Sequence, residues 1–106
     1  MTNIAYYIRE NQLEDVLKNM DIGSGSNKIH KMIENADASK VYVITNYGKG
    51  RVVVAEINIK ESYEDKHHKW AYRVKGDEKS KKIDPPIPFV ELFPDKPFTY
   101  PVIRYV

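Results

Sequence analysis

The sequence predicts an α+β domain, and three observations lead to this prediction. A segment rich in β-forming residues opens the chain, two short stretches with helical periodicity follow, and β-branched and aromatic runs with sharp turns fill the remainder. The length of 106 residues suits one small core, so we expect residues 1–106 to form a single domain. Short strands joined by sharp turns indicate a small barrel or a strongly curled sheet, because curling removes exposed edges.

The first three elements follow from local patterns. Residues 3–10 (NIAYYIRE) are rich in β-formers and predict a strand. Residues 11–20 predict a helix capped by Asn11, with Glu14 as the returning acid of a capping box. The apolar residues of this helix have the i, i+3, i+4, i+7 spacing of one helical face: Leu13, Val16, Leu17 and Met20.

A loop and a second short helix come next. Residues 21–27 (DIGSGSN) contain two glycines and two serines and predict a loop. Residues 26–36 predict a helix with Ser26 as its cap and three inward apolar residues: Ile29, Met32 and Ile33. Two interpretations of the GSGS segment stay open: a flexible helix-entry loop, or backbone amides at a helix mouth that receive a phosphate or a base edge.

Residues 40–59 give the clearest prediction, a β-hairpin. Two β-branched runs flank the turn NYGKG. The second run is apolar at alternate and intervening positions alike, which predicts a strand buried on both faces.

The rest of the chain predicts strands separated by charged segments. Residues 60–69 read as a polar loop, residues 70–75 (WAYRVK) as a strand, and residues 76–82 as a charged turn. All six prolines lie in residues 83–106, so this tail should hold short edge strands and turns. Its last residues, YPVIRYV, predict a closing strand.

Composition excludes several classes of protein. A hydrophobic content of 42% favours a packed globule, and the absence of cysteine excludes disulfides and thiolate zinc sites. No apolar stretch approaches the roughly 20 residues of a membrane span, and the first residues lack the pattern of a signal peptide. We therefore expect a cytoplasmic protein with no membrane partner. The net charge of +2 permits a nucleic-acid partner without requiring one.

The sequence shows no recognisable catalytic or metal site. There is no G-x-S-x-G elbow around any serine, and no nucleophile–base arrangement can be recognised. The adjacent His67 and His68 point apart, which favours solvated loop histidines over a metal site. We therefore predict a protein that is not an enzyme and that needs no cofactor or metal.

Basic residues are interleaved with aromatic ones in two segments, a pattern that suits nucleic acid because cations neutralise phosphates and exposed rings stack on bases. We predict that the four cations form one basic face and that Trp70 braces the site from the core, with direct ligand contact as the alternative. These candidate residues are Tyr47, Lys49, Arg51, Tyr63, Lys69, Trp70 and Arg73.

The order of these elements resembles the EVE-type domains of the PUA-like superfamily, which are related to ASCH and YTH domains. The resemblance rests on IAYYIRENQLEDVLKN, KVYVITNYGKGRVVVAEI, WAYRVK and IDPPIPFVEL, within residues 3–93. It implies a small PUA-like pseudo-barrel of five or six strands with two short helices after the first strand. It also implies a non-catalytic module that binds RNA, or DNA carrying a modified base, in a pocket beside the first strand and the loop after the first helix.

The resemblance also assigns site residues by position. They are Arg9 and Asn11 at the end of the first strand, Ile22, Gly23 and Ser24 after the first helix, and Tyr63. Relatives usually have a tryptophan at the position of Ile22, which favours an alternative, a protein-interaction or regulatory module that kept the fold and lost base binding. A hydrolase of modified nucleosides is a third possibility, for which Lys18, Glu56 and Lys69 are candidates by residue type only. The choice between RNA and DNA and the oligomeric state stay open.

Overall fold

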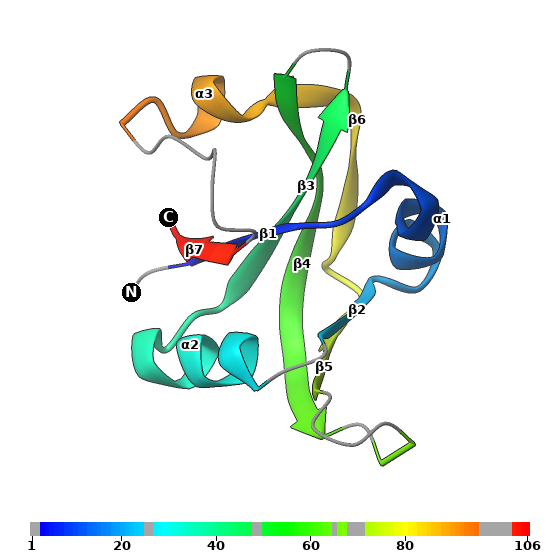
Figure 1. The fold of residues 1–106 in the computed structure, drawn as a ribbon, viewed down its shortest axis with the longest axis vertical. Helices are drawn as coiled ribbons and strands as arrows, with labels where there is room; N and C mark the ends of the chain where they lie inside the picture. Colours follow the sequence, from blue (N-terminus) through cyan, green and yellow to red (C-terminus); the bar gives the residue numbers. More distant parts are fainter. Residues whose placement is uncertain (1–2, 25–26, 48–49, 65, 68–71, 96–102) are drawn as a thin grey trace.

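The computed structural model of the chain describes residues 3–24, 27–47, 50–64, 66–67, 72–95 and 103–106 (Figure 1). Within these residues it has three helices and seven strands, so the predicted α+β class is confirmed. The elements are β1 (Ile4–Tyr7), α1 (Glu10–Asn19), β2 (Asp21–Ser24), α2 (Lys28–Ala36), β3 (Lys40–Tyr47), β4 (Gly50–Glu64), β5 (Tyr72–Gly76), β6 (Lys81–Pro88), α3 (Phe89–Leu92) and β7 (Ile103–Tyr105).

The strands form one mixed sheet in the order β2-β5-β4-β3-β1-β7, and β6 pairs with β4 beside this path. The long strand β4 has different partners along its length: it pairs with β6 over Val52–Glu56 and with β5 over Ile59–Glu64. The two end strands, β2 and β7, lie on opposite sides of β4 (Figure 1), and no pairing joins them among the residues that the structure describes. Among the described residues the sheet is therefore open and has seven strands, whereas the sequence predicts a pseudo-barrel or strongly curled sheet of five or six strands.

The two predicted helices are present, but a strand separates them. Ile22, 1% exposed, pairs with Val74 of β5, and this burial outweighs the weak β-propensity of the glycines and serines around it. The prediction of a loop over residues 21–27 is thus wrong for Asp21–Ser24, which form β2. Both predicted caps are also wrong: Asn11 lies inside α1, whose N-cap is Arg9, and the N-cap of α2 is Asn27.

The predicted hairpin is confirmed. Strand β3 pairs antiparallel with β4 from Lys40 opposite Asn58 to Tyr47 opposite Gly50. Strand β4 is buried on both faces as predicted, because Val52 and Val54 pack in one apolar cluster and Val53 in another.

Strand β4 extends beyond its predicted end. Residues 60–64, predicted as polar loop, continue the strand because their backbone pairs with β5 while Lys60, Glu61 and Glu64 stay exposed. Strand β5 begins at Tyr72, and the first two residues of the predicted strand, Trp70 and Ala71, lie outside the described residues.

The tail behaves largely as its prolines predict. Strand β6 contains three of them and pairs with β4 alone among the described strands, as an edge strand does. Strand β7 pairs antiparallel with β1, which confirms the closing strand. The short helix α3 was not predicted, because four residues are too few to show a helical period.

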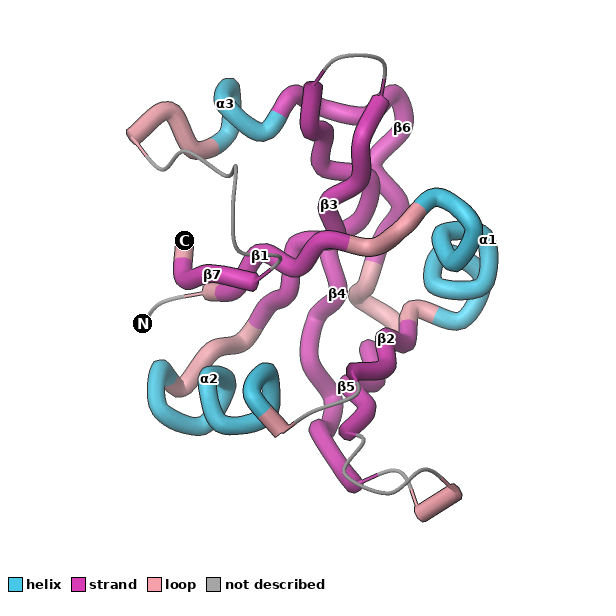
Figure 2. Tube along the Cα trace, viewed as in Figure 1, coloured by secondary structure: helices cyan, strands magenta, loops and turns pink. Residues whose placement is uncertain are grey.

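Two apolar clusters lie on either side of the sheet. The larger one packs α1 and α2 against the sheet through Val16, Ile29 and Ile33. The smaller one centres on Phe89 of α3, which is 2% exposed. Figure 2 shows α3 beside the turn end of the β3–β4 hairpin and α2 toward its other end. The described residues include no helix of sufficient length and apolarity to cross a membrane.

Candidate functional site

A pocket of about 240 Å³ lies between α1, β2 and β5, next to the residue that follows β1. We call it the α1–β2–β5 pocket. It occupies the region to which the resemblance assigns a base-binding site. Its lining residues are Ile8, Gln12, Asp15, Val16, Asn19, Asp21, Gly23 and Arg73.

An ion pair between Arg73 and Asp21 forms one wall of this pocket. Arg73 Nε donates a hydrogen bond of 3.0 Å to Asp21 Oδ1, and Arg73 Nη2 lies 2.9 Å from the same oxygen. The Asp21 side chain is 17% exposed and that of Arg73 is 37% exposed. The pair is therefore held in place while the guanidinium still reaches solvent.

Gly23 makes room for this guanidinium. It lies opposite Arg73 in the β2–β5 pairing, and a Cβ atom on Gly23 would come 2.8 Å from Arg73 Nη1. A further contact holds β2 in place, since the hydroxyl of Tyr6 donates to the carbonyl of Gly23 at 3.5 Å. The absence of a side chain at residue 23 thus lets Arg73 lie across the β2 backbone.

The alternation of side chains along β5 explains why Arg73 faces the pocket. Val74 is fully buried, whereas Arg73 and Lys75 point to the opposite face, as the period of two predicts. Tyr63 of β4 lies directly opposite Arg73, so both side chains share one face. Tyr63 is 37% exposed, which places an accessible aromatic ring beside the pocket.

Helix α1 supplies the polar groups on the other side of the pocket. Gln12, Asp15 and Asn19 follow the i, i+3, i+7 spacing and so share one helical face. Asn19 Nδ2 donates to the backbone carbonyl of Asp15 at 3.1 Å. With Asp21, the lining holds two carboxylates and one guanidinium, a balance that disfavours a phosphate group inside the pocket and favours a ligand edge with N–H donors.

The predicted site residues around this pocket divide into two groups. Gly23 and Arg73 line it, and Tyr63 lies beside Arg73. The prediction that Ile22 forms part of the binding wall is wrong. Ile22 is buried in the larger apolar cluster and has no surface that could contact a ligand.

Three further predicted residues lie near the pocket. Arg9 and Asn11 are exposed at the start of α1. Ser24 ends β2, where its backbone pairs with Tyr72, and its side chain lies outside what the structure describes.

Of the predicted basic face the structure describes Arg51 and Arg73, and these two cations are well separated. Arg51 and Arg73 lie near opposite ends of β4, since Arg51 is at its start and Arg73 pairs with Tyr63 near its end, at roughly 3.3 Å per residue along the strand. Arg51 instead lies over the ring of Tyr7, with Cζ 4.6 Å from the ring centroid.

Four other candidate residues from the basic–aromatic segments lie wholly or partly outside the described residues. Lys49, Lys69 and Trp70 lie outside the described residues. The backbone of Tyr47 pairs with Gly50, and its side chain is likewise outside.

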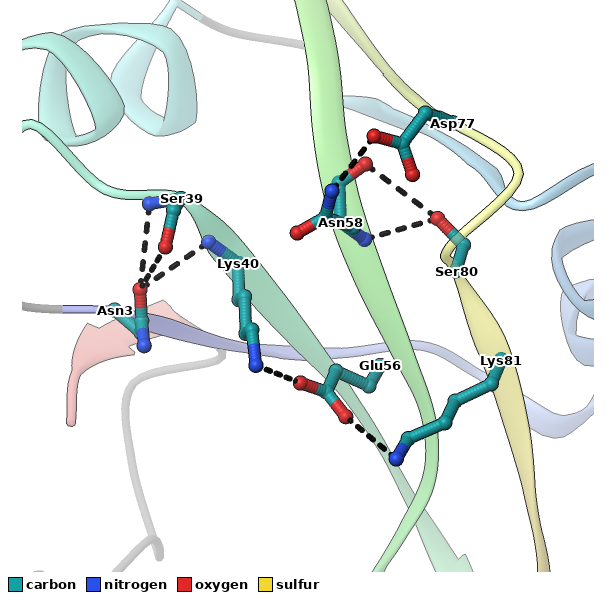
Figure 3. Close-up of polar contacts among 8 residues, drawn as sticks. All are labelled: Asn3, Ser39, Lys40, Glu56, Asn58, Asp77, Ser80 and Lys81. Carbon is teal, nitrogen blue, oxygen red and sulfur yellow. Dashed lines mark hydrogen bonds and ion pairs between the residues drawn. The ribbon is translucent and has the colours of Figure 1, made fainter.

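A polar cluster near the middle of β4 ties three strands together (Figure 3). Lys40 Nζ lies 2.5 Å from Glu56 Oε1, and Lys81 Nζ lies 3.5 Å from Oε2. The hydrogen bond from Lys40 is the main reason why the pKa of Glu56 is lowered, and it raises the pKa of Lys40 in turn. Burial raises the pKa of the neighbouring Tyr42. The cluster is a structural one, because each charge has a partner.

The structure also brings together a serine, a histidine and a glutamate that the sequence kept apart. His30 Nδ1 lies 2.8 Å from Ser62 Oγ, and His30 Nε2 lies 2.9 Å from Glu34 Oε1. Sequence reasoning missed this contact because Ser62 is 32 positions from His30 and has no motif around it. Only the i, i+4 spacing of His30 and Glu34 was visible.

Neither a metal site nor a match to a known protein adds to this description of the described residues. Among the described residues, no group of three or more His, Cys, Asp or Glu side chains is placed to hold a metal ion. No family model matches the chain, and no curated protein matches it.

Proposed function

We propose that the chain binds nucleic acid, without catalysis at that site, and holds a base of RNA, or a modified base of DNA, in the α1–β2–β5 pocket. The resemblance to PUA-like EVE-type domains motivates the proposal, and a PUA-like fold is part of it. The observation that carries it is the Arg73–Asp21 pair across Gly23, with the exposed Tyr63 alongside.

The lining suits a base better than a phosphate. Carboxylates accept hydrogen bonds from amino groups of bases, side-chain amides form paired hydrogen bonds with a base edge, and guanidinium donates to base acceptors. Asp21, Gln12 and Arg73 provide one group of each kind. Tyr63 lies where a neighbouring base could stack, and stacking contributes about 1–3 kcal/mol per base.

The experiment is a fluorescence-anisotropy titration with single- and double-stranded RNA and DNA at low salt, where phosphate affinity is greatest. We expect binding that weakens as salt rises. Arg73→Gln should weaken it, and Tyr63→Ala should weaken it by roughly 5- to 150-fold, the equivalent of one stacked base. Arg51→Gln is the matched control, because Arg51 lies near the other end of β4. No binding to any oligonucleotide at low salt would refute the proposal.

One observation favours a second candidate, a protein-interaction module. Val90 and Leu92 of α3 are 64% and 39% exposed, and exposed apolar side chains can mark an interaction surface. Leu92 also borders a groove of about 430 Å³, which Tyr42, Ile83 and Ile87 line as well. Light scattering over a concentration series tests for self-association, and Val90→Asp should abolish any that is found.

A further inference from the structure

Three side chains form a continuous relay on the α2 side of the sheet. His30 and Glu34 lie one turn apart on α2, and Ser62 comes from β4. Each ring nitrogen of His30 has one of these partners. Nδ1 lies 2.8 Å from Ser62 Oγ, and Nε2 lies 2.9 Å from Glu34 Oε1. Tyr72 stacks against the same ring, with centroids 4.6 Å apart and planes 25° apart, so the orientation of the imidazole is fixed.

The partners of His30 determine its tautomer. An ionised carboxylate can only accept hydrogen bonds, so Nε2 carries a proton when it faces Glu34. The neutral ring then has its lone pair on Nδ1, which faces Ser62 Oγ. The hydroxyl of Ser62 is therefore the donor in the 2.8 Å hydrogen bond, as a serine must be if a base is to remove its proton.

We propose that Ser62 is an activated nucleophile that accepts an acyl group from an activated ester or thioester. A serine, a histidine base and an orienting carboxylate are the recurring requirements for this chemistry, which are recognised by geometry and not by sequence order. Ser62 is partly exposed and His30 is 22% exposed, so a small acyl donor can reach the oxygen.

The step is balanced within these groups. Ser62 Oγ attacks the carbonyl carbon of the donor while its proton moves to His30 Nδ1. A bond forms between Ser62 Oγ and the carbonyl carbon. The ester C–O bond or thioester C–S bond of the donor breaks, and the departing alcohol or thiol takes the proton from Nδ1. Glu34 acts as a positioning residue, since it holds the tautomer and stabilises the imidazolium that forms between the two proton transfers.

This activity is independent of the proposed nucleic-acid site. Ser62 pairs with the buried Val74, whereas the next residue, Tyr63, pairs with Arg73 on the pocket face. Successive residues of a strand point to opposite faces, so Ser62 and the α1–β2–β5 pocket lie on opposite faces of β4 and β5. A failure of one proposal leaves the other to be tested by its own assay.

The experiment uses p-nitrophenyl acetate with the intact protein. Release of p-nitrophenolate gives the rate, and peptide mass mapping locates the acetyl group. We expect one equivalent of acetyl on Ser62 in the wild type and none at this position in Ser62→Ala. His30→Gln should slow acetylation of Ser62 by roughly 100-fold or more, the usual contribution of a general base. Glu34→Gln should slow it less, and Glu34→Asp should restore part of the rate.

The control variant is Ser39→Ala, because Ser39 hydrogen-bonds to Asn3 and not to a histidine. Its acetylation rate at Ser62 should equal that of the wild type. Circular dichroism must show that each variant is folded. The proposal is overturned if Ser62 is acetylated equally fast in folded His30→Gln, if it reacts no faster in the native protein than in urea, or if the acetyl group is found only on other residues such as the exposed His67.

Discussion

Replacing Gly76 with alanine should destabilise the protein through steric overlap at the end of β5. A Cβ atom there would overlap Ser80 Oγ and would come 2.9 Å from Ile57 Cγ2 and 3.0 Å from the carbonyl oxygen of Met20. Two of these atoms cannot easily move away. Ile57 is fully buried, and the Met20 carbonyl accepts a 2.8 Å hydrogen bond from the backbone N–H of Gly76 itself.

The size of the effect follows from these contacts. Ser80 could rotate away, but its Oγ would then lose the 2.9 Å hydrogen bond from the backbone N–H of Asn58, about 1 kcal/mol. Overpacking against Ile57 and Met20 adds about 1–3 kcal/mol. The lower entropy of the unfolded alanine chain offsets about 0.4–1 kcal/mol. We therefore expect Gly76→Ala to lower the free energy of unfolding by about 1–3.5 kcal/mol.

Gly50 provides a matched control within another strand. A Cβ atom on Gly50 would meet nothing within 4 Å, so Gly50→Ala should not lower the free energy of unfolding and should raise it by up to about 1 kcal/mol. Urea denaturation followed by circular dichroism measures both variants, and thermal unfolding should show a Tm lower by roughly 4–8 °C for each kcal/mol lost. If both variants unfold at the same urea concentration as the wild type, the reasoning about close approach at Gly76 is wrong.

Three further substitutions test the cores and polar contacts. Because Lys40 holds the pKa of Glu56 below its ordinary value of 4.5, the stability that this carboxylate adds is present above that pH and is lost as pH falls through the lower folded-state pKa. Glu56→Gln should therefore lower the free energy of unfolding by about 1–2 kcal/mol at pH 7. In urea titrations at several pH values, its free energy of unfolding should fall less steeply below pH 4.5 than that of the wild type. Parallel pH profiles of the two proteins would contradict this. Phe89→Ala should lose about 3–5 kcal/mol by urea denaturation, since this ring fills the smaller cluster, and a loss under about 1 kcal/mol would mean that the cluster does not pack as described. Asn3→Ala should lose about 1–2 kcal/mol in the same assay, because its Oδ1 accepts from the backbone N–H groups of Ser39 and Lys40 (Figure 3); unchanged stability would show that water replaces it.

Elements with a strong local pattern could be predicted from the sequence. The hairpin followed from two β-branched runs around a glycine-containing turn, and the two helices followed from their apolar spacing. The face of β5 that carries Arg73 also followed from the period of two.

Elements that depend on distant partners could not be predicted. The Asp21–Ser24 segment looks like a loop by composition and is a strand only because β5 lies beside it. The charged end of β4 is extended for the same reason. Local propensity is weak in both places, so tertiary pairing decides their conformation.

The candidate site shows the same division. Gly23, assigned by the resemblance, and Arg73, taken from the basic–aromatic pattern, both line a pocket, and the use of that pocket for a base stays a proposal. The contributions of Gln12 and Asp15 could not be foreseen, because the angle between α1 and β2 determines which helical face borders the pocket. The link between His30 and Ser62 depends on α2 lying over β4 and β5, which no spacing in the sequence encodes.

The pairing of β1 with β7 has a consequence for the order of folding. Ile4 lies opposite Tyr105, and the backbone N–H of Val106 donates to the carbonyl of Asn3 at 2.9 Å, so two segments that are about 100 residues apart in the sequence lie side by side. The parallel contact between β1 and β3 closes a much shorter loop and can form first. Strand β7 should therefore dock late onto a preformed β3–β1 edge, and its amides should be the last to gain protection from hydrogen exchange during refolding.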